Sequence, residues 1–216
     1  MQQLVIFDCD GVLVDSEPIS NRVLAEMLAA EGLSRTPAQA RREYQGLLLR
    51  DVVAQAEGAL GRPLPDGWEE LYEQRRDAAF ARELRAVADA EGAVAAVRAA
   101  GLDACVASQA RLRKTRHSLA VTGLSELFDA QELFSAESVA RGKPHPDLFL
   151  HAARSMGSNP AASVVVEDTP SGVAAGVAAG MRVLGYAADS DEAALRAAGA
   201  ETFTAMGELP ARLGIA

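Results

Sequence analysis

Short apolar runs recur along the chain, most of them with β-branched residues. They are Gln3–Phe7, Asp103–Ala107, Ser163–Val166 and Met181–Gly185. Runs of this kind are typical of strands buried on both faces of a parallel sheet. Alanine-rich segments of helical character separate them, at Gly92–Ala100, Arg111–Val121 and Asp147–Met156. The alternation predicts an α/β fold, a doubly wound parallel sheet with helices on both faces.

The stretch from about Glu17 to Arg85 interrupts this alternation. Apolar positions at its start share one helical face, and Gly32 suits the end of that helix. These positions are Ile19, Val23, Leu24, Met27 and Leu28. Further helical segments are predicted at Ala38–Tyr44, Arg50–Leu60 and Trp68–Arg85. We therefore expect a core domain of residues 1–16 and 86–216 and a helical insert of residues 17–85.

Composition narrows the possible partners. The net charge is -9 and the basic residues are scattered, which argues against nucleic acid. No apolar run approaches the roughly 20 residues of a membrane span, and no leader segment is evident at the N-terminus. Cys9 and Cys105 lie in apolar stretches and fit buried thiols of a reducing compartment. We expect a cytoplasmic monomer without a membrane partner.

Two carboxylates stand directly after the first strand, in Asp8-Cys9-Asp10-Gly11. Ligands of an open α/β sheet bind at the carboxyl ends of strands, which is where Asp8 lies. Side chains spaced i, i+2 can point to the same side, so the two anions would repel unless a cation were bound. Oxygen ligands of this kind suit Mg²⁺. The alternative, aspartates that only cap a helix or fill a turn, is disfavoured by matching segments later in the chain.

Two of those segments supply polar donors. Ser108 and Gln109 follow the second strand, where a hydroxyl can bind a phosphate oxygen or simply cap a helix. Lys143 lies in the loop Arg141-Gly142-Lys143-Pro144-His145-Pro146. It is one of two lysines among 21 basic residues, the other being Lys114. In a chain that otherwise uses arginine, this lysine indicates that a compact ammonium is required.

The last segment again ends a buried strand in carboxylates, Glu167 and Asp168. Thr169 can cap the following helix, with Pro170 in its first turn. That helix carries three glycines, which we interpret as allowing close packing on the sheet. They are Gly172, Gly176 and Gly180.

These four segments, in this order, resemble the four signature motifs of the haloacid dehalogenase superfamily over essentially the whole chain, which implies a Rossmann-like core. The helical insert is similar to the cap of the β-phosphoglucomutase-like phosphatases. Within that group the chain is most similar to the 6-phosphogluconate phosphatase type. The residues that carry this similarity are Asp15-Ser16-Glu17, Gln45-Gly46 and the tail from Thr202 to Pro210.

The resemblance implies a Mg²⁺-dependent phosphatase acting on small phosphorylated metabolites such as sugar or sugar-acid phosphates. Asp8 would attack phosphorus to form an aspartyl-phosphate, and Asp10 would protonate the leaving alcohol and then activate water. The Asp8 carboxylate, the Asp10 carbonyl and Asp168 would hold the metal, with Glu167 bound directly or through water. Lys143 would neutralise the nucleophile and bind phosphoryl oxygens.

The resemblance also implies substrate contacts. Ser108 would stabilise phosphoryl oxygens, and Gln109 beside it is expected to contact substrate. The helical insert would act as a lid that excludes water. Glu17 at its start, and Arg75 or Arg76 late in it, are candidates for binding the leaving group; alternatively they are solvated helix-surface charges.

Four other functions are alternatives to this one. A 2-haloacid dehalogenase lacks the second aspartate of the first motif, here Asp10. A phosphonate hydrolase needs a cap lysine, and residues 17–85 contain none. A hexose-phosphate mutase of the β-phosphoglucomutase type stays open as the alternative. Such mutases carry a histidine soon after the first motif, where this chain reads Ser16-Glu17-Pro18-Ile19-Ser20-Asn21. A non-catalytic binding domain is disfavoured because every motif carboxylate and the lysine are present.

Overall fold

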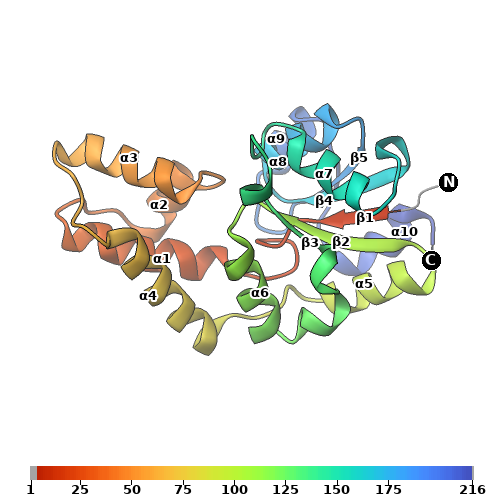
Figure 1. Ribbon diagram of the computed structural model, residues 1–216, viewed down its shortest axis with the longest axis horizontal. Helices are drawn as coiled ribbons and strands as arrows, with labels where there is room; N and C mark the ends of the chain where they lie inside the picture. The colour runs from red at the N-terminus through yellow and green to blue at the C-terminus, as the bar shows by residue number, and fades with distance from the viewer. Residues whose placement is uncertain (1–3, 216) are drawn as a thin grey trace. The chain divides into compact units, whose positions relative to one another are not determined.

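The computed structural model describes residues 4–215, which form a six-stranded parallel sheet and the helices around it (Figure 1). The strand order is β3-β2-β1-β4-β5-β6. The strands are β1 Leu4–Phe7, β2 Asp103–Ser108, β3 Leu133–Ser135, β4 Ser163–Glu167, β5 Arg182–Tyr186 and β6 Glu201–Phe203. From β1 the order runs outward in both directions, as in a doubly wound sheet. The predicted fold class is confirmed.

The four central strands are those expected from the apolar runs, shifted by no more than about a residue at either end. Gln3, expected to start the first strand, lies outside the described residues. The edge strands β3 and β6 were not predicted. Each has three residues, which is too short to give a recognisable hydrophobic pattern.

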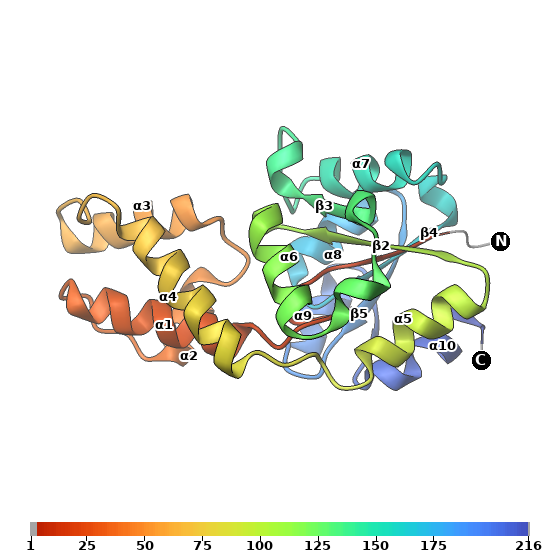
Figure 2. The same ribbon diagram turned by 60° about the horizontal axis from the view of Figure 1, so that its bottom comes forward.

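Helices cover both faces of the sheet (Figure 2). One layer contains α5 Ala90–Ala99, α6 Leu112–Val121 and α10 Leu209–Leu213. The other contains α7 Asp147–Ser155, α8 Pro170–Ala178 and α9 Glu192–Ala197. Short 3₁₀ turns lie at Leu124–Leu127, Ala130–Glu132, Ala136–Ser138, Pro160–Ala162 and Met206–Glu208. The two layers leave the carboxyl ends of the strands to their loops, where the candidate residues lie.

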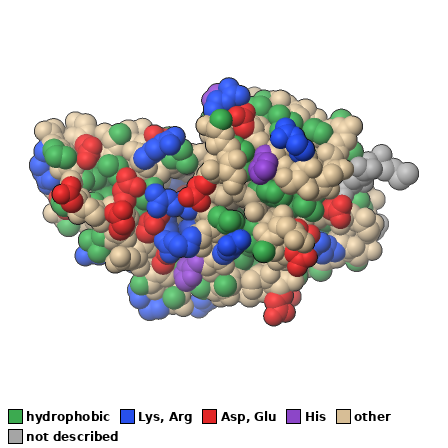
Figure 3. Space-filling view, in the orientation of Figure 1, with side chains coloured by type: hydrophobic (Ala, Val, Ile, Leu, Met, Phe, Trp, Pro, Cys, Tyr) green, Lys and Arg blue, Asp and Glu red, His purple; other side chains and the backbone are tan. Residues whose placement is uncertain are grey.

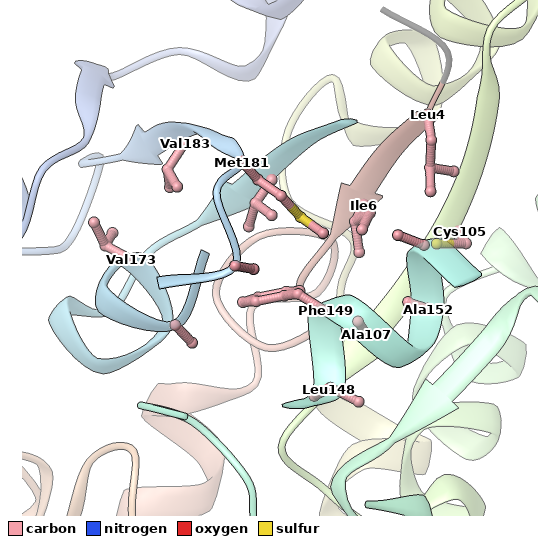
Figure 4. Packing of buried hydrophobic residues seen from close by; sticks show 14 of the residues in the cluster. Leu4, Ile6, Cys105, Ala107, Leu148, Phe149, Ala152, Val173, Met181 and Val183 are labelled. Carbon is pink, nitrogen blue, oxygen red and sulfur yellow. The ribbon is translucent and has the colours of Figure 1, made fainter. Parts of the chain in front are cut away.

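The core between the sheet and the α7–α9 layer is apolar (Figure 4). Ile6 and Cys105 on the sheet and Leu148 and Phe149 on α7 are fully buried in it. Burying a large apolar side chain of this kind stabilises a fold by about 1.5–3 kcal/mol. Cys105 and Cys9 are both buried and unbridged, as the sequence predicted. This packing holds in place the strands whose carboxyl ends carry the candidate residues.

Ser16–Leu84 forms a second compact unit made of helices. These are α1 Glu17–Ala30, α2 Pro37–Tyr44, α3 Leu49–Leu60 and α4 Trp68–Glu83. Thr36 and Gln39 cap α2 reciprocally, and Gly61 ends α3 in the left-handed conformation. The rings of Trp68 and Tyr72 stack with centroids 6.0 Å apart. The rest of the described chain, up to Asp15 and from Arg85 onward, is the sheet unit.

The surface carries charges of both signs. On the face in Figure 3, Lys and Arg side chains are interspersed with Asp and Glu side chains. Among residues 4–215, no helix is both long enough and apolar enough to cross a bilayer.

Candidate active site

Asp8 stands at the centre of the sheet edge where the strands end. Its backbone amide donates to the Val166 carbonyl at 2.9 Å, so it directly continues the pairing of β1 with β4. Phe7, the residue before it, pairs with Val166 on one side and with Val106 on the other. Glu167 directly follows Val166 on β4, and Ser108 lies two residues after Val106 on β2. Because parallel strands end at the same edge, three of the predicted site residues are brought together there.

Lys143 is the cation at this edge. Its Nζ lies 2.5 Å from Asp8 Oδ1, 2.7 Å from Glu167 Oε1 and 3.1 Å from the Ala107 carbonyl. Three acceptors match the three donors of an ammonium group. The Lys143 side chain is 3% exposed, and its Nζ lies 5.0 Å from the ring centroid of Phe149. The sequence identified this lysine but not its second carboxylate partner, Glu167.

The electrostatics follow from this packing. Burial raises the pKa of Asp8 to about 7; Lys143 lowers that pKa, and Glu167 and Asp10 raise it. Burial lowers the pKa of Lys143, but the carboxylates of Asp8 and Glu167 outweigh it and raise that pKa above the usual value. Lys143 therefore stays an ammonium, and the site carries more negative charge than it alone compensates.

Glu167 is held entirely by protein donors. Its Oε1 binds Lys143, and its Oε2 accepts from the amides of Asp168 and Thr169, each at 2.8 Å, and from Thr169 Oγ1 at 2.9 Å. Thr169 Oγ1 also accepts from the Gly172 amide at 3.1 Å, which confirms the predicted cap of α8. Glu167 was expected to bind metal directly or through water. Oε1 accepts one hydrogen bond and Oε2 accepts three, and the expected role of Glu167 at the metal stays a prediction.

The three glycines of the α8 segment differ in role. A Cβ on Gly176 would lie 2.7 Å from Val183, which fits the predicted close packing on the sheet. A Cβ on Gly172 would lie 1.8 Å from the Glu167 carboxylate, so this glycine makes room for the site. For Gly180 the packing prediction was wrong. It has φ +73° with open space around it, and it follows the end of α8 as a left-handed turn residue.

Magnesium is implied by the resemblance, and the residues present fit it. A Cβ on Gly11 would lie 2.2 Å from Asp168 Oδ2, so Asp168 lies directly against the loop that follows Asp8. The carboxylates of Asp8 and Asp168 and the carbonyl of Asp10 are the hard oxygen donors that Mg²⁺ prefers. Within residues 4–215, no three acidic, histidine or cysteine side chains already converge as a metal site. The ligand set therefore stays a prediction.

Asp10 contacts a residue that was not assigned to the site. Its Oδ1 binds Nζ of Lys114, the second lysine of the chain, from the first turn of α6. One feature of the sequence singles out Lys114, namely that it is one of only two lysines in an arginine-rich chain. Nothing in the sequence indicated its partner, which is 104 positions away.

The two residues after β2 have internal contacts. Ser108 is buried, and its Oγ accepts from the Ala110 amide at 3.1 Å. Gln109 was expected to contact substrate, yet its side-chain oxygen accepts from the Lys143 amide at 3.0 Å. Ser108 therefore stabilises the loop after β2, and Gln109 joins that loop to the one that carries Lys143.

The remaining candidates, Glu17 and Arg76, belong to the helical unit. Glu17 begins α1, and its Oε2 accepts from Asn21 Nδ2 at 3.0 Å. The Arg76 guanidinium donates twice to Asp77 Oδ1, at 3.1 and 2.8 Å. It also lies 5.5 Å from the ring centroid of Tyr72. Their roles toward substrate stay predictions.

The site thus consists of carboxylates at the tips of two adjacent central strands of a doubly wound sheet, joined by a buried lysine. The family model described as haloacid dehalogenase-like hydrolase matches residues 2–180. The chain belongs to this family.

Named relatives agree with this assignment. The chain is 32% identical over 209 residues to the 6-phosphogluconate phosphatase of Escherichia coli K12, covering 96% of this chain and 93% of that protein. It is 32% identical over 180 residues to hexitol phosphatase B of the same organism, covering 82% and 80%. A crystal structure of a HAD family hydrolase from Deinococcus radiodurans, with bound phosphate and sodium, matches with TM-score 0.81 and 33% identity. It covers 99% of this chain and 97% of that one.

Proposed function

We propose that the chain is a Mg²⁺-dependent phosphatase of small phosphorylated metabolites, with sugar or sugar-acid phosphates as the substrate class. The observation that carries the proposal is the contact of Asp8 with the buried ammonium of Lys143, with Asp10 two residues further along. The ammonium of Lys143 offsets the repulsion between the Asp8 carboxylate and an anionic phosphate. Asp8 can therefore approach phosphorus as a nucleophile. The phosphatase names of two relatives support the same reaction class.

The reaction runs in two displacements. An oxygen of Asp8 attacks phosphorus, the bond from phosphorus to the substrate oxygen breaks, and Asp10 donates a proton to the departing alcohol. Asp10 then takes a proton from a water molecule that attacks the aspartyl-phosphate, which releases inorganic phosphate and restores Asp8. Lys143 and Ser108 bind phosphoryl oxygens as charge shifts among them.

Asp8, the Asp10 carbonyl and Asp168 would hold Mg²⁺, with Glu167 bound directly or through water. When bound, the ion supplies positive charge that stabilises the phosphoryl oxygens. Glu167 anchors Lys143 beside Asp8 in this scheme, since its four donors fix its position.

The helical unit, Ser16–Leu84, would serve as the lid of residues 17–85 expected from the sequence. Its closure would exclude water from the first displacement. Glu17 and Arg76 are the residues proposed to contact the leaving group. The Arg76 guanidinium is held at one place on α4 by Asp77 and Tyr72, which suits a residue that selects substrate by position.

Replacing Asp8 tests the nucleophile. Asp8→Asn should fold as the wild type does and release no phosphate from p-nitrophenyl phosphate with Mg²⁺ present. The matched control is Asp103→Asn, an exposed aspartate at the start of β2, which should keep wild-type turnover. Phosphate release by Asp8→Asn at a rate near that of the wild type would refute the proposal.

A mutase differs from a phosphatase in its product. Incubation with β-glucose 1-phosphate and its bisphosphate separates the two activities. A phosphatase yields inorganic phosphate in proportion to substrate consumed. Rapid formation of glucose 6-phosphate without net phosphate release would establish the mutase instead.

A further inference from the structure

Each of the two lysines of this chain binds one of the two aspartates that follow β1. Lys143 binds Asp8, and Lys114 binds Asp10. Lys114 comes from a different element, the first turn of α6, which follows the loop after β2. The two cations thus reach the two carboxylates from separate segments, Lys114 from α6 and Lys143 from the loop before α7.

The position of Lys114 is unfavourable for a cation that no anion compensates. The side chain is 7% exposed, and burying an ammonium costs free energy unless an anion compensates it. It also lies in the first turn of a helix, where the helix dipole disfavours positive charge. Arg113 and Arg116 on the same helix are exposed to solvent instead. Contact with the Asp10 carboxylate contributes to offsetting the cost of this placement.

Asp10 gains a fixed orientation from the contact. Its side chain is 21% exposed and lies in a turn whose backbone is closed by its own hydrogen bonds, from the Leu13 and Val14 amides to the Cys9 carbonyl. Those bonds act on the Asp10 backbone, whereas the contact with Lys114 acts on its carboxylate. An ammonium at the carboxylate selects one arrangement.

We propose that Lys114 is a positioning residue of the active site that holds the Asp10 carboxylate in place for proton transfer. The inference rests on the proposed function, in which Asp10 is the general acid and base. Lys114 acts through Asp10 rather than on the substrate. Displacing a catalytic group by about 1 Å can cost roughly 100-fold in rate, so loss of this contact should be measurable.

Leaving-group dependence tests the proposal. Lys114→Met removes the ammonium and keeps an unbranched side chain. Its kcat/KM for p-nitrophenyl phosphate should fall less than about threefold, because p-nitrophenolate departs without a proton. For the alkyl phosphate that the wild type hydrolyses fastest, kcat/KM should fall about 100-fold, the lower range of general acid catalysis. Arg116→Met, an exposed residue of the same helix, is the control and should match the wild type with both esters.

Two further variants sharpen the test. In an Asp10→Asn background, Lys114→Met should cause no additional loss with the alkyl ester, because the group it positions is gone. Lys114→Arg keeps the charge and should restore part of the alkyl phosphatase activity; it also replaces Lys114→Met in the test if that variant is unstable. Equal losses with the two esters, or losses that add to those of Asp10→Asn, would overturn the inference.

A crystal structure of Lys114→Met gives a readout independent of activity. The Asp10 carboxylate should lose its defined position, and finding it unmoved would overturn the inference. If the wild-type protein hydrolyses no phosphate ester, the proposed function fails, while this comparison still decides whether Lys114 positions Asp10.

Discussion

The side-chain oxygen of Gln109 accepts a hydrogen bond from the backbone amide of Lys143 at 3.0 Å. This bond joins the loop after β2 to the loop that carries the site's lysine. A Cβ built on Gly142, the residue before Lys143, would lie 2.6 Å from the Gln109 amide group. An alanine at position 142 would therefore require the Gln109 side chain to move out of this contact.

Gly142→Ala should lower kcat without unfolding the protein. The added methyl group displaces Gln109 and, with it, the Lys143 amide, so we expect turnover of p-nitrophenyl phosphate to fall about 10- to 100-fold. Steady-state kinetics and thermal denaturation measure the two effects separately. Gly92→Ala is the control, because a Cβ there meets nothing within 4 Å, and its kcat should be unchanged. Wild-type turnover in Gly142→Ala would show that the Gln109 contact does not position Lys143.

Lys143 and Glu167 should be thermodynamically coupled. Lys143→Met leaves the Asp8 and Glu167 carboxylates buried without their shared cation, which should cost about 3–5 kcal/mol of unfolding free energy. Glu167→Gln added to that variant removes one of the two uncompensated charges, so it should destabilise far less than Glu167→Gln alone. Urea unfolding in EDTA of the four proteins of this cycle gives the coupling. Strict additivity would contradict the arrangement.

Asp168 should be required for Mg²⁺ binding. Its carboxylate lies against Gly11 in the loop after β1, next to the other proposed ligands. Asp168→Asn should weaken Mg²⁺ binding by at least about 100-fold, since loss of outer contacts alone costs roughly 10- to 100-fold. Isothermal titration calorimetry with MgCl₂ measures this directly, with Asp103→Asn as the control carboxylate. Unchanged affinity in Asp168→Asn would remove Asp168 from the ligand set.

The α7 face of the core should set much of the stability. Leu148 is fully buried between α7 and the sheet, and Leu148→Ala should lower the unfolding free energy by about 2–5 kcal/mol. Val177→Ala, on α8 and 45% exposed, should change it by less than about 0.5 kcal/mol. Denaturant titration of both variants measures the difference, and similar values for the two would contradict the assigned core.

The sequence predicted the central strands and the residues at their tips because both are local properties. A strand buried on both faces is an apolar run, and a polar residue marks its end: β1 stops just before Asp8, and Glu167 is the last residue of β4. The parallel arrangement then places these tips at one edge without further information. The edge strands β3 and β6 were not predicted, because three residues are too few to show a hydrophobic pattern.

Contacts between distant side chains were decided only by the tertiary structure. The pairs Lys114–Asp10 and Lys143–Glu167 and the turn of Gln109 toward Lys143 depend on where the loops of different strands lie in space. Hydrophobic periodicity indicates which face of a helix or strand is buried. It does not indicate which polar group of another segment a side chain on that face contacts. The sequence by itself thus determined the sheet and the acidic residues at its edge. The partners of these residues were decided only by the tertiary structure, because an ion pair depends on distance through space and not on separation along the chain.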